Sequence, residues 1–284
     1  MSLSDDSFVL SDLSFSSVTP GEDQRWSTWP SIIPSFRGPK PWPSWMVISA
    51  GAIDTELGVL KSGKEADVFL IERAVPDDGG PPVEPSAVLL AAKRYRGTDT
   101  SDFHRSSQYT EGRRTRRSRD SRALHKKSAY GRALSAGLWA SAEFTALSEL
   151  YELGAPVPYP VQVNDTELLM EFIGDGKEAA PRLAAVCASA RELGDLWEQV
   201  VELMRIFARA GYAHGDLSPY NLLVHRGRVV VIDVPQIVDI VSNPRGMELV
   251  ERDCINVCSW FTRRGLECDP AELSGELMAE AFGR

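Results

Sequence analysis

The stretch HGDLSPYNLLVHRGRVVVIDV, residues 214–234, decides the fold. Its apolar runs Leu222–Val224 and Val229–Asp233 flank a turn at Arg226-Gly227, a pattern that predicts a short β-hairpin. The polar loop before the hairpin is therefore anchored at a strand, and its side chains are held in defined positions.

Three polar residues of this stretch carry a chemical pattern. Asp216 is followed after four residues by Asn221, and Asp233 ends the second strand. This is the spacing of a kinase catalytic loop and its metal-binding strand. Asp216 would orient or deprotonate a phosphoryl acceptor, while Asn221 and Asp233 offer hard oxygen ligands that suit Mg²⁺ and also Mn²⁺. The alternative is that these residues only shape a turn, and the flanking strands favour the catalytic interpretation.

Two upstream residues extend the pattern. Lys93 ends the β-rich run Val88–Ala92, and Glu143 lies in a predicted helix over Leu134–Leu153. A strand lysine can reach nucleotide phosphates, and a helix glutamate can hold it through an ion pair. Alone, either residue would be read as a surface charge.

A turn between the first two predicted strands, LKSGKEADV at residues 60–68, is a candidate phosphate loop. Its backbone amides, the Ser62 hydroxyl and Lys64 could cradle phosphates. The stretch contains neither GxGxxG nor the P-loop pattern, so its position before the Lys93 strand carries the interpretation.

The order of predicted elements is a small antiparallel sheet, a long helix, a strand pair, helices, a hairpin and further helices. This order predicts an α+β protein of two lobes with a cleft between them. Residues 1–44 are rich in Ser, Pro and Trp without periodicity, and we expect a disordered or loosely packed arm there. The domain then covers 45–284, with an N-lobe over about 54–170 and a C-lobe over about 174–284.

The net charge and the composition argue against some classes of function. A formal net charge of -9 over 284 residues argues against a protein that coats nucleic acid with its whole surface. Residues 104–132, within a loop expected over 97–132, carry ten basic residues against Glu111 and Asp120, which makes this segment able to hold an anionic partner. No CxxC pair, signal peptide or long apolar span is evident, so we expect a cytoplasmic protein without a membrane anchor.

Six sequence blocks resemble the RIO family of atypical protein kinases over about residues 54–265. Within that family, the resemblance is greatest to the bacterial relatives of the first subfamily. The blocks are SGKEADVFL (62–70), AAKRYR (91–96), WASAEF (139–144), LLMEFIGD (168–175), HGDLSPYNLLVH (214–225) and VVVIDVPQIVD (229–239), and the run DCINV at 253–257 fits the family's next helix.

The resemblance implies a reduced RIO version of the bilobal protein-kinase-like fold, with ATP and Mg²⁺ as cofactors. It implies serine/threonine kinase or ATPase activity and an aspartyl-phosphate intermediate at Asp233. It also implies that Ser62, Lys64 and Lys93 contact phosphates, that Met170–Ile173, with Glu171 and Ile173, forms the adenine hinge, and that Asn221 and Asp233 bind the metal.

Departures from ordinary protein kinases leave the substrate open. Gly215 replaces the usual arginine, Val234-Pro235-Gln236 follows Asp233, and no APE segment follows. By analogy with eukaryotic and archaeal family members, 104–132 would contact ribosomal RNA or a ribosomal particle, and the alternative is a solvated loop. A small-molecule phosphotransferase of the aminoglycoside or choline kinase type and a nucleotide-regulated binding scaffold are the competing functions. The oligomeric state is left open.

Overall fold

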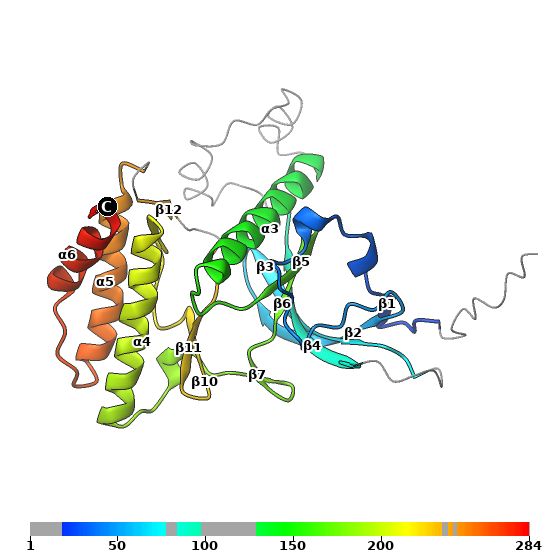
Figure 1. Cartoon of the computed structure of the whole chain (residues 1–284), viewed down its shortest axis with the longest axis horizontal. Coiled ribbons are helices and arrows are strands. Elements are labelled where there is room, and N and C mark those ends of the chain that lie inside the picture. Colours follow the sequence, from blue (N-terminus) through cyan, green and yellow to red (C-terminus); the bar gives the residue numbers. More distant parts are fainter. Residues whose placement is uncertain (1–18, 78–83, 98–128, 235–237, 241–242, 284) are drawn as a thin grey trace, which may run out of the picture.

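A six-stranded antiparallel sheet forms the N-lobe, with strand order β1-β2-β3-β4-β6-β5. The computed structural model describes residues 19–77, 84–97, 129–234, 238–240 and 243–283. The sheet occupies one side of the molecule and the helical lobe the other (Figure 1). Its strands are β1 (Gln24–Trp26), β2 (Ile53–Ser62), β3 (Ala66–Ala74), β4 (Ala87–Tyr95), β5 (Pro160–Asn164) and β6 (Glu167–Glu171).

The long helix α3 (Ala129–Glu152) packs on one face of this sheet. It buries Ala136, Ala140, Phe144 and Leu147, which recur at three- and four-residue intervals along one stripe. The helix predicted over 134–153 is present and begins earlier, so 129–132 belong to it and not to the basic loop. Residues 98–128 of that loop lie outside the described part of the chain.

The opposite face of the sheet is covered by the segment 19–50. Strand β1 pairs with β2, and Trp29 and Met46 are buried against Ile71, Leu90 and Tyr159. The prediction of a loose arm through residue 44 is therefore wrong for residues 19–44, because their tryptophans supply the apolar cover that this sheet face needs. Residues 1–18 are not among those described.

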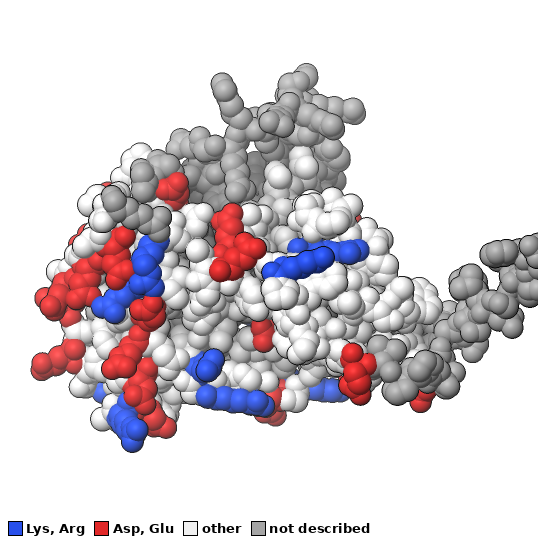
Figure 2. All heavy atoms as spheres, in the orientation of Figure 1, with Lys and Arg blue, Asp and Glu red and all other residues white. Residues whose placement is uncertain are grey.

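The C-lobe is built from α4 (Ala190–Arg209), α5 (Gly246–Thr262) and α6 (Pro270–Phe282). A capping box of Ser189 and Glu192 starts α4, which runs unbroken through Gly194. Figure 2 shows acidic and basic side chains interleaved over these helices. Arg205 and Arg209 of α4 pair there with glutamates of α6.

The remaining elements are short. They are the hairpin β7 (Gly174–Asp175) and β8 (Glu178–Ala179), the pair β9 (Tyr212–Ala213) and β12 (Val238–Asp239), the hairpin β10 (Leu222–His225) and β11 (Arg228–Val231), and 3₁₀ turns at Trp29–Ser31, Pro34–Phe36 and Leu183–Ala185. The two-lobed α+β prediction is confirmed. Among the described residues no helix is both long and apolar enough to cross a bilayer.

Candidate active site

Lys93 joins the two lobes at the cleft. Its Nζ lies 2.8 Å from Glu143 Oε1 of α3 and 2.9 Å from Asp233 Oδ1, just past β11. The Tyr95 hydroxyl donates to the second oxygen of Glu143, whose side chain is almost fully buried. The predicted Lys93–Glu143 ion pair is therefore present, and it reaches the predicted metal-binding aspartate.

The charges at this junction stabilise one another. Burial acts to lower the pKa of Lys93, but the carboxylates of Glu143 and Asp233 outweigh it and raise that pKa to about 12. Burial acts to raise the pKa of Asp233, and Lys93 and then Lys61 hold it below its usual value. Lys93 and Asp233 are therefore both ionised at neutral pH.

The catalytic-loop candidates lie beside this junction. Asn221 Nδ2 donates to the Asp216 carbonyl at 3.0 Å, and Ile232 N donates to the Asn221 carbonyl at 2.9 Å. Asp233 has φ of 64°, a left-handed conformation that aspartate tolerates better than most residues. These bonds bring Asn221 and the residue before Asp233 together, as the spacing predicted.

Asp253 of α5 binds the backbone of the catalytic loop. Its two carboxylate oxygens accept Gly215 N and Leu217 N, both at 2.8 Å. Gly215 has φ of 78°, which explains a glycine at this position. Burial raises the pKa of Asp253 to about 6, against the opposing effect of the two amides. We had not predicted Asp253 as a site residue, although the DCINV run contained the signal.

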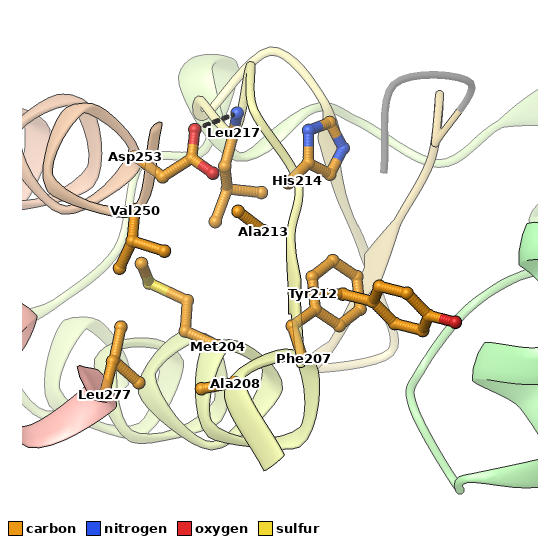
Figure 3. Close-up of a pocket in the computed structure, with 10 residues that line it drawn as sticks. All are labelled: Met204, Phe207, Ala208, Tyr212, Ala213, His214, Leu217, Val250, Asp253 and Leu277. Atoms are coloured by element: carbon orange, nitrogen blue, oxygen red, sulfur yellow. Dashed lines mark hydrogen bonds between the residues drawn. The ribbon is translucent and has the colours of Figure 1, made fainter. Parts of the chain in front are cut away.

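A cavity of about 20 Å³ lies between Asp253, His214 and the apolar side chains of α4, α5 and α6 (Figure 3). This volume admits a single water and no larger ligand. Burial lowers the pKa of His214, whose Nδ1 accepts the Asp216 amide at 3.3 Å. His214 thus braces the loop by accepting this backbone amide.

The candidate phosphate hairpin holds Ser62 in a local hydrogen-bond network. The Ser62 hydroxyl donates to Asp67 and accepts from Arg96, so it is already engaged. Lys64 is exposed in the three-residue turn between β2 and β3. Phosphate contacts by Ser62 and Lys64 stay predictions, and a contact by the Ser62 hydroxyl would compete with this network.

The candidate hinge, Met170–Ile173, begins with the last two residues of β6. Glu171 N donates to the Tyr159 carbonyl at 2.8 Å, and the Glu171 carboxylate accepts Tyr159 N at 3.1 Å. Ile173 packs against Leu223, with Ile232 beside them, and forms an apolar surface next to the hinge. The Glu171 side chain is thus engaged within the N-lobe, and an adenine ring would meet the hinge backbone and this surface.

Comparisons with known proteins agree with this geometry. Residues 88–273 match the family model described as RIO domain. The chain belongs to the RIO family. It is 36% identical over 225 residues to the RIO-type serine/threonine-protein kinase Rio1 of Haloferax volcanii, covering 79% of this chain and 69% of that protein. It is 30% identical over 224 residues to the serine/threonine-protein kinase RIO3 of Bos taurus, covering 78% of this chain and 41% of that protein.

A solved structure shares the fold. The Rio2 kinase from Chaetomium thermophilum superposes with a TM-score of 0.50 and 20% identity, over 79% of this chain and 67% of that one. The chain is an ATP-dependent phosphotransferase of the RIO type, as its family model and its curated relatives indicate. It spans 41% of the bovine relative's length. The small-molecule kinase and scaffold alternatives are not favoured.

The RIO-family site has a donor set that fits a divalent cation. Kinases of this kind use ATP with a divalent metal, and Mg²⁺ usually takes one or two protein carboxylates beside phosphate oxygens and water. Asp233 and Asn221 supply two hard oxygens of that kind. No group of three or more His, Cys, Asp or Glu side chains suited to a metal occurs in the described ranges.

Proposed function

We propose that this chain transfers the γ-phosphoryl group of ATP to a serine or threonine hydroxyl of a protein, with Asp216 as the catalytic base. The observation that carries the proposal is the Lys93 bridge. One ammonium contacts Glu143 from the N-lobe and Asp233 from the C-lobe, and so it brings both halves of the site to one point.

The residues divide the work as follows. Asp216 accepts the proton of the attacking hydroxyl, and Asp253 and Gly215 fix the backbone that carries Asp216. Lys93 neutralises phosphate charge, and Asn221 with Asp233 holds the cation, for which we favour Mg²⁺. When bound, that cation neutralises the developing phosphate charge.

The nucleotide base would lie at Met170–Ile173. The Ile173 carbonyl accepts Ala180 N at 2.9 Å, so the base would use the remaining backbone groups of this hinge. Leu223 and Ile232 offer an apolar floor beneath it.

A second activity is ATP hydrolysis through Asp233. Its side chain is 38% exposed, and its lowered pKa keeps it an ionised nucleophile. Its carboxylate oxygen would attack the γ-phosphorus, ADP would leave, and water would then cleave the acyl phosphate. Protein-bound label from [γ-³²P]ATP that hydroxylamine removes is the expected sign, and its persistence in Asp233→Ala would contradict this route.

The proposed kinase activity is tested with Asp216→Asn and [γ-³²P]ATP, with label transfer to a generic acceptor protein and phosphate release followed in parallel. The matched control is Asp165→Asn, an exposed aspartate in the β5–β6 turn. We expect about 10²- to 10⁴-fold slower transfer in Asp216→Asn and none of this loss in the control. Equal rates in all three proteins would overturn the role of Asp216.

The basic segment 104–132 is the proposed contact for ribosomal RNA or a ribosomal particle. Its support is the sequence itself, which places ten basic residues against two acidic ones. Replacing its arginines by serine should weaken filter binding of structured RNA and flatten its salt dependence. Unchanged binding would remove this proposal and leave the kinase proposal intact.

A further inference from the structure

An irregularity in β2 decides which side chain of the phosphate hairpin faces the cleft. Along the β2–β3 ladder, Val59 pairs with Phe69, but the next pair is Lys61 with Val68, and Leu60 is the extra residue. A bulge of this kind puts two residues opposite one and changes which side chains share a face. Lys61 therefore takes the side of the sheet that a regular strand would have given to its neighbour.

That side is the one that carries Lys93. Val68 pairs with Lys61 on one edge and with Lys93 on the other, so the three residues form one row across β2, β3 and β4. Residues directly opposite one another in a sheet share a face. The two lysines are two strand spacings apart, about 10 Å between their backbones, and they flank Val68 over the cleft.

The charges in the cleft leave a role for a second cation. Lys93 already contacts two carboxylates, those of Glu143 and Asp233. Lys61 is exposed and shares the sheet face of Lys93, in the row through Val68. Ser62, the next residue, is tied to Asp67 and Arg96. Of these two neighbours, Lys61 is the one on the face of Lys93, because Ser62 pairs with Asp67 and lies on the other face.

We propose that Lys61 is a phosphate-binding residue that contacts the terminal phosphates of the nucleoside triphosphate and favours ATP over nucleotides with fewer phosphates. The inference rests on the proposed function, since it needs ATP to bind in this cleft. It adds Lys61 to the phosphate contacts predicted for Ser62 and Lys64, and it pairs Lys61 with Lys93 across Val68 as two cations that bind one anion.

The test compares Lys61→Met with Lys40→Met by titration calorimetry of ATP, ADP and adenosine in Mg²⁺. Lys40 is the matched control, because its ammonium stacks over Trp42 in the segment that covers the other face of the same sheet. We expect Lys61→Met to weaken ATP binding about tenfold, ADP binding less, and adenosine binding less than about twofold. Lys40→Met should bind all three ligands like the wild type.

The outcomes separate the two proposals. If the wild type binds ATP and Lys61→Met binds it equally well, the role of Lys61 is overturned while the proposed function stands. If Lys61→Met weakens adenosine as much as ATP, the effect is structural and the role is again overturned. If the wild type does not bind ATP, the proposed function itself fails. Thermal unfolding of each variant checks the fold, and Lys61→Arg should retain most of the ATP affinity.

Discussion

The two faces of the N-lobe sheet use similar charged residues in opposite ways. On the outer face, Arg73 is fully buried and donates to both oxygens of Asp54, at 2.6 and 3.0 Å, and to Gln162. On the cleft face, Lys93 and Asp233 are paired, but Asp233 remains 38% exposed. The Arg73 network on the outer face has its main partners within the protein, whereas the Lys93–Asp233 pair at the cleft is accessible to a charged ligand.

The closure of the outer face depends on the segment that covers it. Trp29, Trp42 and Met46 pack over Ile71 and Leu90, and Trp29 and Trp42 meet edge to face. Charges sealed in this way can only support folding, while charges at the cleft can also bind and react. Substitutions that separate stability from nucleotide binding test this difference.

Arg73→Met should give the largest loss of stability. It leaves Asp54 as a buried charge without its main partner, and breaking such a pair costs about 3–5 kcal/mol. Urea unfolding measures the loss, and ATP affinity of the folded protein should not change. Arg209→Met, which removes the exposed pairs of Arg209 with Glu202 and Glu280, is the control and should cost less than about 1 kcal/mol. Equal losses of unfolding free energy in Arg73→Met and Arg209→Met would contradict the view that the buried Arg73 pair stabilises the fold more than an exposed pair does.

Trp29→Ala tests whether residues 19–44 belong to the folded domain. The Trp29 side chain is 3% exposed, and truncation of a buried tryptophan costs about 3–5 kcal/mol. Trp26→Ala is the matched control, because Trp26 is 44% exposed in the neighbouring strand β1. Its effect should stay within about 0.5 kcal/mol. A small effect of Trp29→Ala on the free energy of unfolding would show that residues 19–44 are a loosely packed arm and not part of the folded domain.

Lys93→Met should affect both properties. It leaves the buried Glu143 without its cation, which we expect to cost about 3 kcal/mol, and it removes a phosphate contact. In the double variant Lys93→Met with Glu143→Leu, stability should return, while phosphoryl transfer stays at least about 100-fold below wild type. Recovery of activity in the double variant would show that the Lys93 charge serves folding alone.

The catalytic loop was predictable from sequence, and the phosphate hairpin was only partly so. Asp216, Asn221 and Asp233 lie in one loop and one hairpin, where short spacing fixes geometry. The bulge at Leu60 depends on the pairing between β2 and β3, which the sequence of the turn does not specify, so it could not be predicted. The cover formed by residues 19–50 was missed because Trp29 and Met46 are buried by distant partners such as Tyr159 and not by any local periodicity.

Asp253 combines features of the structural charges and of the active-site charges. It is buried like Arg73, but it also holds the catalytic loop. Its pKa of about 6 in the folded protein is above the value near 3.9 of an unfolded chain. Between these values the folded state binds more protons, so this group stabilises the protein at low pH and loses that contribution as pH rises from about 4 to 6.

Asp253→Asn removes this titration and so sharpens the comparison. The stability of wild type relative to Asp253→Asn should fall by roughly 2–3 kcal/mol between pH 4 and pH 7, at about 1.4 kcal/mol per pKa unit. Urea unfolding at several pH values measures it, and a difference that does not vary with pH would contradict it. Because an amide offers one oxygen to the amides of Gly215 and Leu217, the variant should also lower kcat while the Kd for ATP holds. Such a split would mark Asp253 as a positioning residue, whose buried charge reaches the chemistry only through the backbone of the loop.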